Sequence, residues 1–546
     1  MMRRVFLVAL PLCLIVLAFS SWFLVPRAES YNTLRIISPN VVAAAGSGLD
    51  ANHRVFRAYA GIEYTIRITA TGGKYPYTFS HVSGAPSGMT IDAGPCTANG
   101  TGCIAGTVTW TSPSAGTYSN ITYRVTDSLG ATVDAVWTLV VSTTACSNAG
   151  GFCFVDDATG NDSNNGDIGS PYKTLIGLKA ARTGHQIVYV HTGTYLIDQT
   201  SSIWTWREDT SGPVIWLCYP GDTCTINWAS TGGAEVSYLR FQGKNIYVDG
   251  FRQANVGSMG IQTVQTSRYG ATYRNLRGLQ LVDGENGMNS AFLMWVNADP
   301  GNPAYFNIIQ NSIFSDIHGD GGIDNGDGGS TADDGCAIKL YNVKDTVIED
   351  NEFNTSAFIE GVVAPKEEAP GTTIRNNKSA SDVLTFVHSN FNNQSGLYES
   401  TSGEILYNLC LSTTGDCLNL ATTKIAGSVI GVWDIYRNTF IGTVEIANLL
   451  TADGPYTFSD NVLLNAQAAS GSCPAKYTCT SVTDYSRLVD NASNLKGLND
   501  GSVANATTGL LINRALVGTV GFEFASLIPP VTISGNARFS GSVRIQ

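Results

Sequence analysis

Charged residues are scarce in this chain of 546 residues, since Asp, Glu, Lys and Arg together make up 14% of the sequence. Basic residues are the scarcer kind: 32 Lys and Arg stand against 44 Asp and Glu, which gives a formal net charge of −12. Tight binding to a phosphate backbone relies on a surplus of cations, so no nucleic-acid partner is expected. The same balance means that a polyanionic substrate requires local cations or a bound metal ion.

The residues on which helical proteins depend, Lys, Glu, Leu and Ala, do not dominate the composition. Glycine is abundant instead, with 58 residues, and Ser, Thr and Asn are frequent. This composition predicts an all-β protein. The chain is too long for one ordinary hydrophobic core, so more than one structural unit is expected.

The N-terminus has the pattern of an export signal. Arg3 and Arg4 precede an uncharged, apolar stretch over residues 5–25, and a polar segment follows up to Ser30. We interpret residues 1–30 as a signal peptide, although the apolar stretch is also long enough for a retained membrane anchor. Contact with a membrane is expected only if the segment is retained. Either interpretation predicts a secreted, extracellular or cell-surface protein.

Eleven cysteines follow this segment, and ten of them form close pairs that are six or seven residues apart. Such spacing is typical of small disulfide loops in an oxidising compartment. Zinc binding is the weaker alternative, because zinc sites favour CxxC-like spacing. We interpret the remaining cysteine, Cys336, as a small buried apolar residue. The predicted disulfides are Cys96–Cys103, Cys146–Cys153, Cys218–Cys224, Cys410–Cys417 and Cys473–Cys479.

Residues 31–145 are predicted to form a β-sandwich. Alternating strand patterns occur at 64–68, 123–125 and 136–141, and turn residues separate them. The segment also resembles the immunoglobulin-like domains of bacterial surface proteins. The resemblance is carried by Gly-Gly-Lys-Tyr-Pro-Tyr at 72–77, Pro-Ser-Gly-Met-Thr-Ile at 86–91 and Tyr-Arg-Val-Thr-Asp-Ser-Leu-Gly-Ala at 123–131. In that family the domain serves as a spacer or a binding unit, so no catalysis is expected from it.

The segment after residue 150 resembles the opening of secreted, pectate-lyase-like parallel β-helix proteins. The resemblance is carried by the Asp- and Asn-rich stretch 154–166, by Ser-Pro-Tyr-Lys-Thr-Leu at 170–175 and by residues 187–195. It implies a right-handed parallel β-helix whose mouth is closed by a short helix, here at 174–182. Residues 156–167 either bind calcium or use their side chains to cap tight turns.

Repeats independently indicate a solenoid between residues 146 and 465, with residues 466–546 as a C-terminal cap and tail. An apolar-x-x-Asn pattern followed by a hydrophobic residue recurs along the segment. We expect each Asn to sit at a bend, because Asn tolerates a left-handed backbone, and to bond to the equivalent amide of the next coil. Nine to eleven coils are predicted. The residues expected to stack in one column are Asn351, Asn377, Asn408, Asn438 and Asn461.

The longest break in the repeat is an acidic, glycine-rich segment at 316–335. Calcium favours clustered oxygen ligands on a flexible backbone, so Ca²⁺ is a candidate cofactor here. A solvated acidic surface loop is the alternative. The candidate metal ligands are Asp316, Asp320, Asp324, Asp327, Asp333 and Asp334.

Cationic residues gather on the coils that follow this segment. Lys339, Lys366, Arg375 and His388 are the candidate catalytic residues, and in-register stacking would bring Lys339, Lys366 and His388 to one face. A polysaccharide lyase needs cations or calcium to neutralise a uronate, a base to remove the adjacent proton and an acid for the leaving oxygen. Scattered solvated side chains are the alternative interpretation.

Three functions remain open from the sequence. The favoured one is a polysaccharide lyase that cleaves a uronic-acid polymer by β-elimination, with the polysaccharide as partner. The second is a glycoside hydrolase of the same fold, since Asp333 and Asp334 resemble the paired aspartates of polygalacturonases, although the motifs that follow the pair in that family are missing. The third is a non-catalytic surface, adhesin or filament protein. The oligomeric state is not predicted.

Overall fold

The computed structural model describes residues 32–39, 49–96, 99–181, 186–196, 203–207, 213–227, 238–242, 244–254, 259–265, 270–281, 290–296, 304–317, 336–355, 361–365, 369–379, 385–389, 402–420, 433–445, 456–459 and 462–464. Within these ranges it contains 39 β-strands, one α-helix and one 3₁₀-helix, which confirms the all-β prediction. Neither helix of the described ranges has the length and apolar character needed to cross a membrane. The predicted export segment and C-terminal cap lie outside the described residues.

The first unit is the predicted β-sandwich. One sheet has the order β2–β9–β8–β5, a second has the order β3–β7–β6, and β1 pairs with β4. Aromatic and aliphatic residues of both sheets, including Tyr64, Tyr123 and Trp137, form its core. The bounds are β1 (Arg35–Ser38), η1 (Arg54–Phe56), β2 (Arg57–Tyr59), β3 (Tyr64–Arg67), β4 (Thr69–Thr71), β5 (Thr78–Ser83), β6 (Met89–Ile91), β7 (Thr107–Trp110), β8 (Gly116–Thr126) and β9 (Thr132–Ser142).

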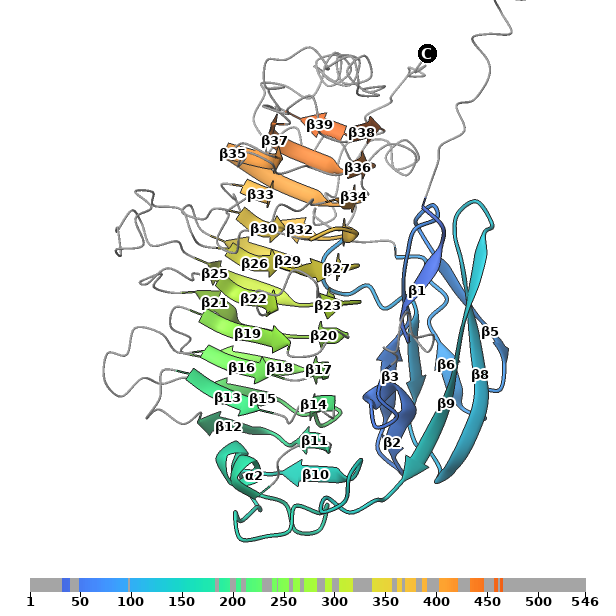
Figure 1. The fold of residues 1–546 in the computed structure, drawn as a ribbon, viewed down its shortest axis with the longest axis vertical. Helices are drawn as coiled ribbons and strands as arrows, with labels where there is room; N and C mark the ends of the chain where they lie inside the picture. The colour runs from blue at the N-terminus through green and yellow to red at the C-terminus, as the bar shows by residue number, and fades with distance from the viewer. Residues whose placement is uncertain are drawn as a thin grey trace, which may run out of the picture.

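The second unit is a right-handed parallel β-helix, as the repeats predicted. One sheet runs its full described length with 11 strands, one from each coil, which agrees with the predicted nine to eleven coils. We call it the inner sheet, because it faces the sandwich (Figure 1). Its strands are β10 (Phe152–Val155), β11 (Ile187–Val190), β14 (Pro213–Cys218), β17 (Lys244–Asp249), β20 (Ala271–Arg274), β24 (Ile308–Gln310), β28 (Val347–Glu349), β31 (Thr372–Arg375), β34 (Gly403–Leu406), β36 (Trp433–Tyr436) and β38 (Tyr456–Ser459).

The remaining strands form the other sides of each coil. A row that we call the outer row contains β13 (Ile203–Arg207), β16 (Tyr238–Gln242), β19 (Met259–Gln265), β22 (Ser290–Val296), β26 (Cys336–Tyr341), β30 (Gly361–Pro365), β33 (Thr385–Ser389) and part of β35 (Leu409–Leu420). The third side contains β12 (Gly193–Leu196), β15 (Cys224–Asn227), β18 (Phe251–Ala254), β21 (Leu279–Leu281), β25 (Ile313–Ile317), β29 (Glu352–Thr355), β32 (Lys378–Ser379), β37 (Thr439–Glu445) and β39 (Val462–Leu464). The short β23 (Ala304–Tyr305) pairs with β27 (Val343–Lys344).

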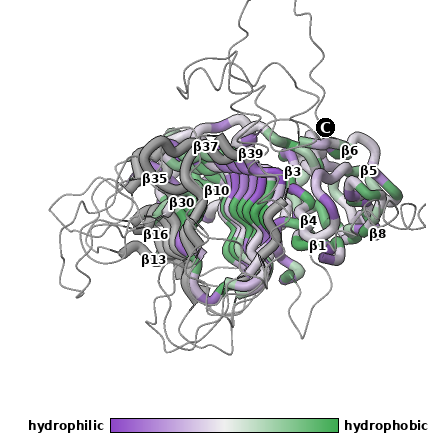
Figure 2. Tube along the Cα trace, turned by 90° about the horizontal axis from the view of Figure 1, so that it is seen from above, coloured by the Kyte–Doolittle hydropathy of each residue, from purple (hydrophilic) through white to green (hydrophobic). Residues whose placement is uncertain are grey.

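An asparagine ladder joins the coils at the bend after the inner sheet. Asn351, Asn377, Asn408 and Asn438 are fully buried, and each of the first three donates its Nδ2 to the Oδ1 of the next at 3.0 Å. The predicted column is thereby confirmed for these four, and Asn461 lies outside the described residues. Viewed along the stack, residues of like hydropathy form continuous columns (Figure 2). No coil can bury its core alone, so such columns are what hold the solenoid together.

The prediction that the ladder asparagine itself has the left-handed backbone of the bend is wrong. Positive φ occurs one position before each ladder asparagine, at Asp350, Asn376, Tyr407 and Arg437, with φ between 54° and 58°. The ladder residue itself needs its amide turned inward, whereas the preceding residue makes the turn. The register also pairs Gln310 with Glu349, so Ser312 rather than Asn311 occupies the ladder position of its coil.

The mouth of the β-helix is closed as expected, by α2 (Leu175–Ala181), whose Leu175 and Leu178 are buried in the core. The Asp- and Asn-rich stretch before it caps turns: Asp162 Oδ1 accepts the Lys173 and Thr174 backbone N–H groups, and Asp156 accepts that of Ala158. Four of the predicted disulfides are formed, namely Cys96–Cys103, Cys146–Cys153, Cys218–Cys224 and Cys410–Cys417. Cys336 is buried and belongs to none of them.

Candidate functional site

Two of the predicted catalytic residues share one column of the outer row. Lys339 lies on β26 and His388 on β33, and β30 is the strand between them. The strand registers pair Lys339 with Ala364 and place Ala364 beside His388. Lys366 is the first residue after β30 and lies outside the described residues. The column therefore brings Lys339 and His388 two coils apart on one sheet, with Ala364 rather than Lys366 at the level between them.

Lys339 is only 4% exposed, so it is not a solvated surface lysine. The acidic segment precedes the strand that carries Lys339, since residues 318–335 connect β25 to β26. Asp316 lies on β25, but its side chain lies outside the description. The other candidate metal ligands lie entirely outside the described residues, namely Asp320, Asp324, Asp327, Asp333 and Asp334.

Arg375 lies away from this column. It ends β31 in the inner sheet and is 2% exposed. Its guanidinium donates to Glu349 Oε2 from both Nη2, at 2.5 Å, and Nε, at 2.8 Å. The rings of Tyr75 and Tyr77, from the sandwich, cover it at 5.2 and 4.9 Å from their centroids. Arg375, which was predicted as a catalytic residue, therefore belongs to the contact between the two domains and lies apart from the column of Lys339 and His388.

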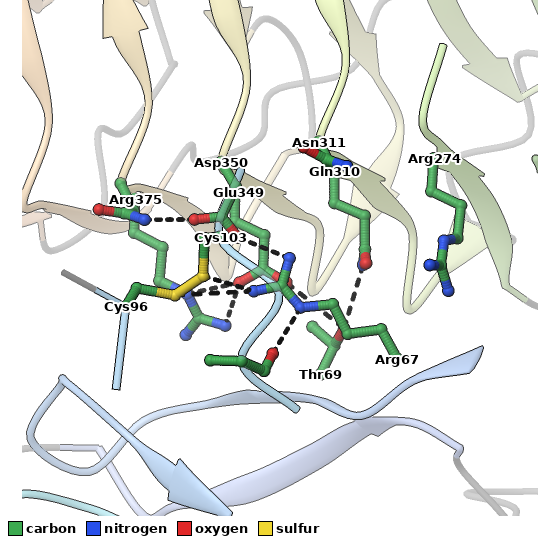
Figure 3. A network of polar contacts seen from close by, with 12 residues as sticks. Arg67, Thr69, Cys96, Cys103, Arg274, Gln310, Asn311, Glu349, Asp350 and Arg375 are labelled. Atoms are coloured by element: carbon green, nitrogen blue, oxygen red, sulfur yellow. Dashed lines mark hydrogen bonds and ion pairs between the residues drawn. A yellow bond between two sulfur atoms is a disulfide. The ribbon is translucent and has the colours of Figure 1, made fainter. Parts of the chain in front are cut away.

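The two domains meet through a buried ionic network (Figure 3). Arg67 of β3 reaches across from the sandwich, and its Nη1 lies 2.6 Å from Asp350 Oδ2 and 4.0 Å from Glu349 Oε1. Thr69 Oγ1 donates to Glu349 Oε1 at 3.5 Å and accepts from Gln310 Nε2 at 3.3 Å. Each side chain of the network is at most 8% exposed, so the attraction between these charges is screened much less than at a surface.

Two carboxylates side by side in this network titrate differently. Burial raises the pKa of Asp350 to about 6, since the nearby charge of Glu349 adds to burial and together they outweigh Arg67. Burial also acts to raise the pKa of Glu349, but Arg375 and Arg67 outweigh it and the pKa is lowered. The difference arises because Glu349 has two guanidinium partners, whereas Asp350 has Arg67 and the amide of Asn376. Glu349 therefore loses its proton more readily than an ordinary glutamic acid, whereas Asp350 loses its proton less readily than an ordinary aspartic acid.

This difference predicts how stability depends on pH. An acid whose pKa is higher in the folded state than in the unfolded state makes stability fall as pH rises between the two values. The contribution of Asp350 to stability should therefore fall from about pH 4 to pH 6, and Asp350→Asn should remove up to about 1.4 kcal/mol per pH unit of that fall from the wild-type profile. Urea unfolding at a series of pH values measures it. If the free energy of unfolding depended on pH in the same way in both proteins, the pKa of Asp350 would not differ between the folded and unfolded states.

Sequence reasoning missed the interface because its partners come from distant segments: Thr69 and Glu349 are 280 residues apart. One signal was present in the sequence. Glu349 and Arg375 occupy the same register position of neighbouring inner-sheet strands, and opposite charges at equivalent repeat positions indicate a cross-strand pair. The nearby group Cys96, Cys103 and Asp350 has metal-ligating residue types. Its two cysteines are joined in a disulfide, so they are not thiolate ligands.

The comparisons with known proteins assign one domain. Residues 47–142 match the family model described as "Putative Ig domain", which confirms the immunoglobulin-like resemblance. No curated protein matches the chain. A rhamnogalacturonan lyase structure is similar with a TM-score of 0.34 and 14% identity, over 60% of this chain and 86% of its own. The pectate lyase Pel9A gives 0.33 and 13%, over 61% and 84%. Likeness at this level carries no argument about the reaction.

Proposed function

We propose that this chain is an exported polysaccharide lyase that cleaves a uronic-acid polymer by β-elimination at the outer row of its β-helix. The observation that supports the proposal is the column that Lys339 and His388 share two coils apart on the outer row, with Lys339 on the strand that follows the acidic segment 316–335. Loops that leave a rigid coil are where proteins of this architecture tend to place function. The four disulfides favour export, because such bridges persist in oxidising compartments.

The reaction divides into three tasks. The uronate carboxylate must be neutralised, a base must remove the neighbouring carbon-bound proton, and an acid must protonate the leaving glycosidic oxygen. We assign the base to Lys366, which follows β30, and the acid to His388. Lys339 is buried and supplies a fixed positive charge to the same column.

Calcium is the proposed cofactor of the acidic segment. The donor set consists of carboxylates on a glycine-rich backbone, which suits a hard cation that takes several oxygen ligands. The residues proposed to hold it are Asp316, Asp320, Asp324, Asp327, Asp333 and Asp334. A bound cation would offset both their mutual repulsion and the negative charge of a uronate.

An absorbance screen tests the proposal. Pectate, alginate and glycosaminoglycans are incubated with the full chain, with and without a chelator, and the band of unsaturated uronates is followed. We expect the band to grow with one polymer class and to be lost when calcium is removed. Release of reducing sugar without that band would indicate a hydrolase. Inactivity on every polymer would favour a non-catalytic surface protein.

A pair of lysine variants tests the assignment of the base. Lys366→Ala should lower the rate of elimination about a hundredfold, the lower end of what a positioned base contributes. Lys173→Ala is the matched control, because Lys173 is an exposed lysine in the turn before α2. Full activity of Lys366→Ala would eliminate Lys366 as the base.

A further inference from the structure

A pocket of about 220 Å³ lies where the sandwich meets the first coils of the β-helix. The sandwich contributes Arg54, Glu63 and Thr65, and the β-helix contributes the turn 218–222 after β14 and the ends of β17 and β20. This volume corresponds to about seven water molecules and is smaller than the pockets of drug-sized ligands. It suits one small, polar unit. The pocket borders the inner sheet, away from the outer row that carries Lys339 and His388.

Two buried guanidiniums line the pocket. Arg54 is 3% exposed, donates to Tyr189 Oη at 3.2 Å and to the Glu63 carbonyl at 3.1 Å, and lies over the ring of Tyr64. Arg274 is 6% exposed, and its Nε lies 3.2 Å from Asp249 Oδ2. In the described part of the chain, the Nε of Arg54 lacks a hydrogen-bond partner, whereas that of Arg274 has the Asp249 carboxylate beside it. A buried donor without an acceptor is costly, so a ligand oxygen that reaches Arg54 Nε would bind favourably.

The turn between β14 and β15 adds an aromatic ring and a carboxylate. The ring of Tyr219 stacks on His191, with centroids 4.2 Å apart. Asp222 Oδ2 lies 2.9 Å from Nδ1 of the same His191 and accepts the backbone N–H of Thr192 at 3.2 Å. One histidine therefore holds both side chains in place. A ring that is held rigidly is suited to packing against the apolar face of a sugar, at little cost in side-chain entropy.

The charges of the pocket select against an anion. Glu63, Asp222 and Asp249 place three carboxylates around it, against the two guanidiniums of Arg54 and Arg274. A uronate would meet more negative than positive charge. Sugar hydroxyls suit both kinds of group, because each donates to a carboxylate and accepts from a guanidinium. The mixture of acceptors, donors and one aromatic ring is therefore matched to a neutral sugar.

We infer that this pocket is a second carbohydrate site, which binds one neutral sugar unit between the immunoglobulin-like domain and the β-helix. The site does not depend on the proposed cleavage of a uronate polymer, since it uses other residues and prefers a neutral sugar to an anionic one. It would anchor a neutral unit of a glycan while a different part of the polymer crosses the outer row. A ligand here touches both domains, so it also favours their docked arrangement.

Calorimetric titration of the full chain with small glycosides tests this inference. The probes are the methyl glycosides of glucose, galactose, mannose and rhamnose, with methyl galacturonate glycoside in its ionised form as the anionic comparison. We expect at least one neutral glycoside to bind with a dissociation constant of roughly 1 mM, and the anionic one to bind at least about tenfold more weakly. Tyr219→Ala and Asp222→Asn should each weaken binding about tenfold, the loss of one aromatic or charged contact.

Asp134→Asn is the matched control, because Asp134 pairs with Arg124 on the sandwich and does not line the pocket. Its affinity should equal that of the wild type. Near-ultraviolet circular dichroism of each variant checks the fold, and Asp222→Asn decides the outcome if Tyr219→Ala fails to fold. Absence of saturable binding by every neutral glycoside overturns the inference. So does unchanged affinity in Asp222→Asn, or tighter binding of the galacturonate than of the neutral probes. None of these outcomes bears on elimination activity, which is measured separately.

Discussion

Replacing Arg67 by methionine is expected to destabilise the protein by about 3–5 kcal/mol, the usual effect of removing one partner from a buried ion pair. The guanidinium is 2.6 Å from Asp350 and also contacts the Ala105 carbonyl at 2.8 Å, and it is 8% exposed. Methionine fills much of the same space but leaves the Asp350 carboxylate buried without its cation. Urea unfolding at pH 7, where Asp350 is mostly charged in the wild type, measures the loss.

Two further variants separate the ion pair from other effects of this substitution. Adding Asp350→Asn to Arg67→Met should recover most of the stability, because no uncompensated charge then remains and Glu349 keeps Arg375. Arg124→Met should change stability little, because Arg124 and its partner Asp134 have side chains that are 42% and 34% exposed and solvent screens their attraction. Equal losses in Arg67→Met and Arg124→Met would contradict a special role of the interface.

The fold was predictable because its sequence signals are local and repeated. The strands of a β-helix recur at the length of one coil, and the asparagine that closes each bend recurs with them, so stacking follows from the spacing alone. Asn377 and Asn408 illustrate this, since 31 residues separate them and their amides bond at 3.0 Å. The disulfides were predictable for the same reason, because each joins residues six or seven positions apart.

The functional residues were harder to predict, because burial in this protein depends on docking of a separate domain. Arg375 is a charge in a repeat strand, and in an isolated β-helix that charge would face solvent. The aromatic side chains of the sandwich, Tyr75 and Tyr77, cover it, and Glu349 neutralises it. A charge that is buried for structural reasons and a catalytic charge look alike in sequence. The pocket at Tyr219 was not predicted for a related reason: one of its two arginines, Arg54, comes from the sandwich and the other, Arg274, from the β-helix.

The contact between the two domains combines a buried ionic network with pairs of aromatic side chains, and the two kinds of contact have different effects. Near the mouth of the β-helix, Tyr59 packs edge-on against Phe152 and Phe154 at 5.2 Å. Further along, Tyr75 packs against Tyr407 at 5.0 Å. Such contacts hold two surfaces together but tolerate sliding, whereas paired charges and their hydrogen bonds fix the register. The inner sheet is therefore held in register against the sandwich.

Replacing Asn377 by alanine is expected to cost about 3–5 kcal/mol, because it removes at least three buried hydrogen bonds and leaves the Asn351 backbone N–H without its acceptor. Asn377 Oδ1 accepts the Asn351 backbone N–H at 3.0 Å, and its Nδ2 donates to the Ile348 carbonyl at 2.9 Å and to Asn408 Oδ1 at 3.0 Å. All of these atoms belong to residues with no exposed surface. Neighbouring coils depend on one another, so the loss should appear in the main unfolding transition rather than as local fraying.

Asn377→Asp separates the two halves of the amide. Aspartate retains an acceptor for the Asn351 N–H but brings a second oxygen toward the Ile348 carbonyl, so its stability should fall as far as that of the alanine variant at pH 7 and improve as the carboxyl is protonated. Asn148→Ala is the control, because Asn148 is exposed in the turn before β10 and should change stability by less than about 0.5 kcal/mol. Equal unfolding midpoints for Asn377→Ala and Asn148→Ala would mean that backbone pairing holds the coils together without the ladder.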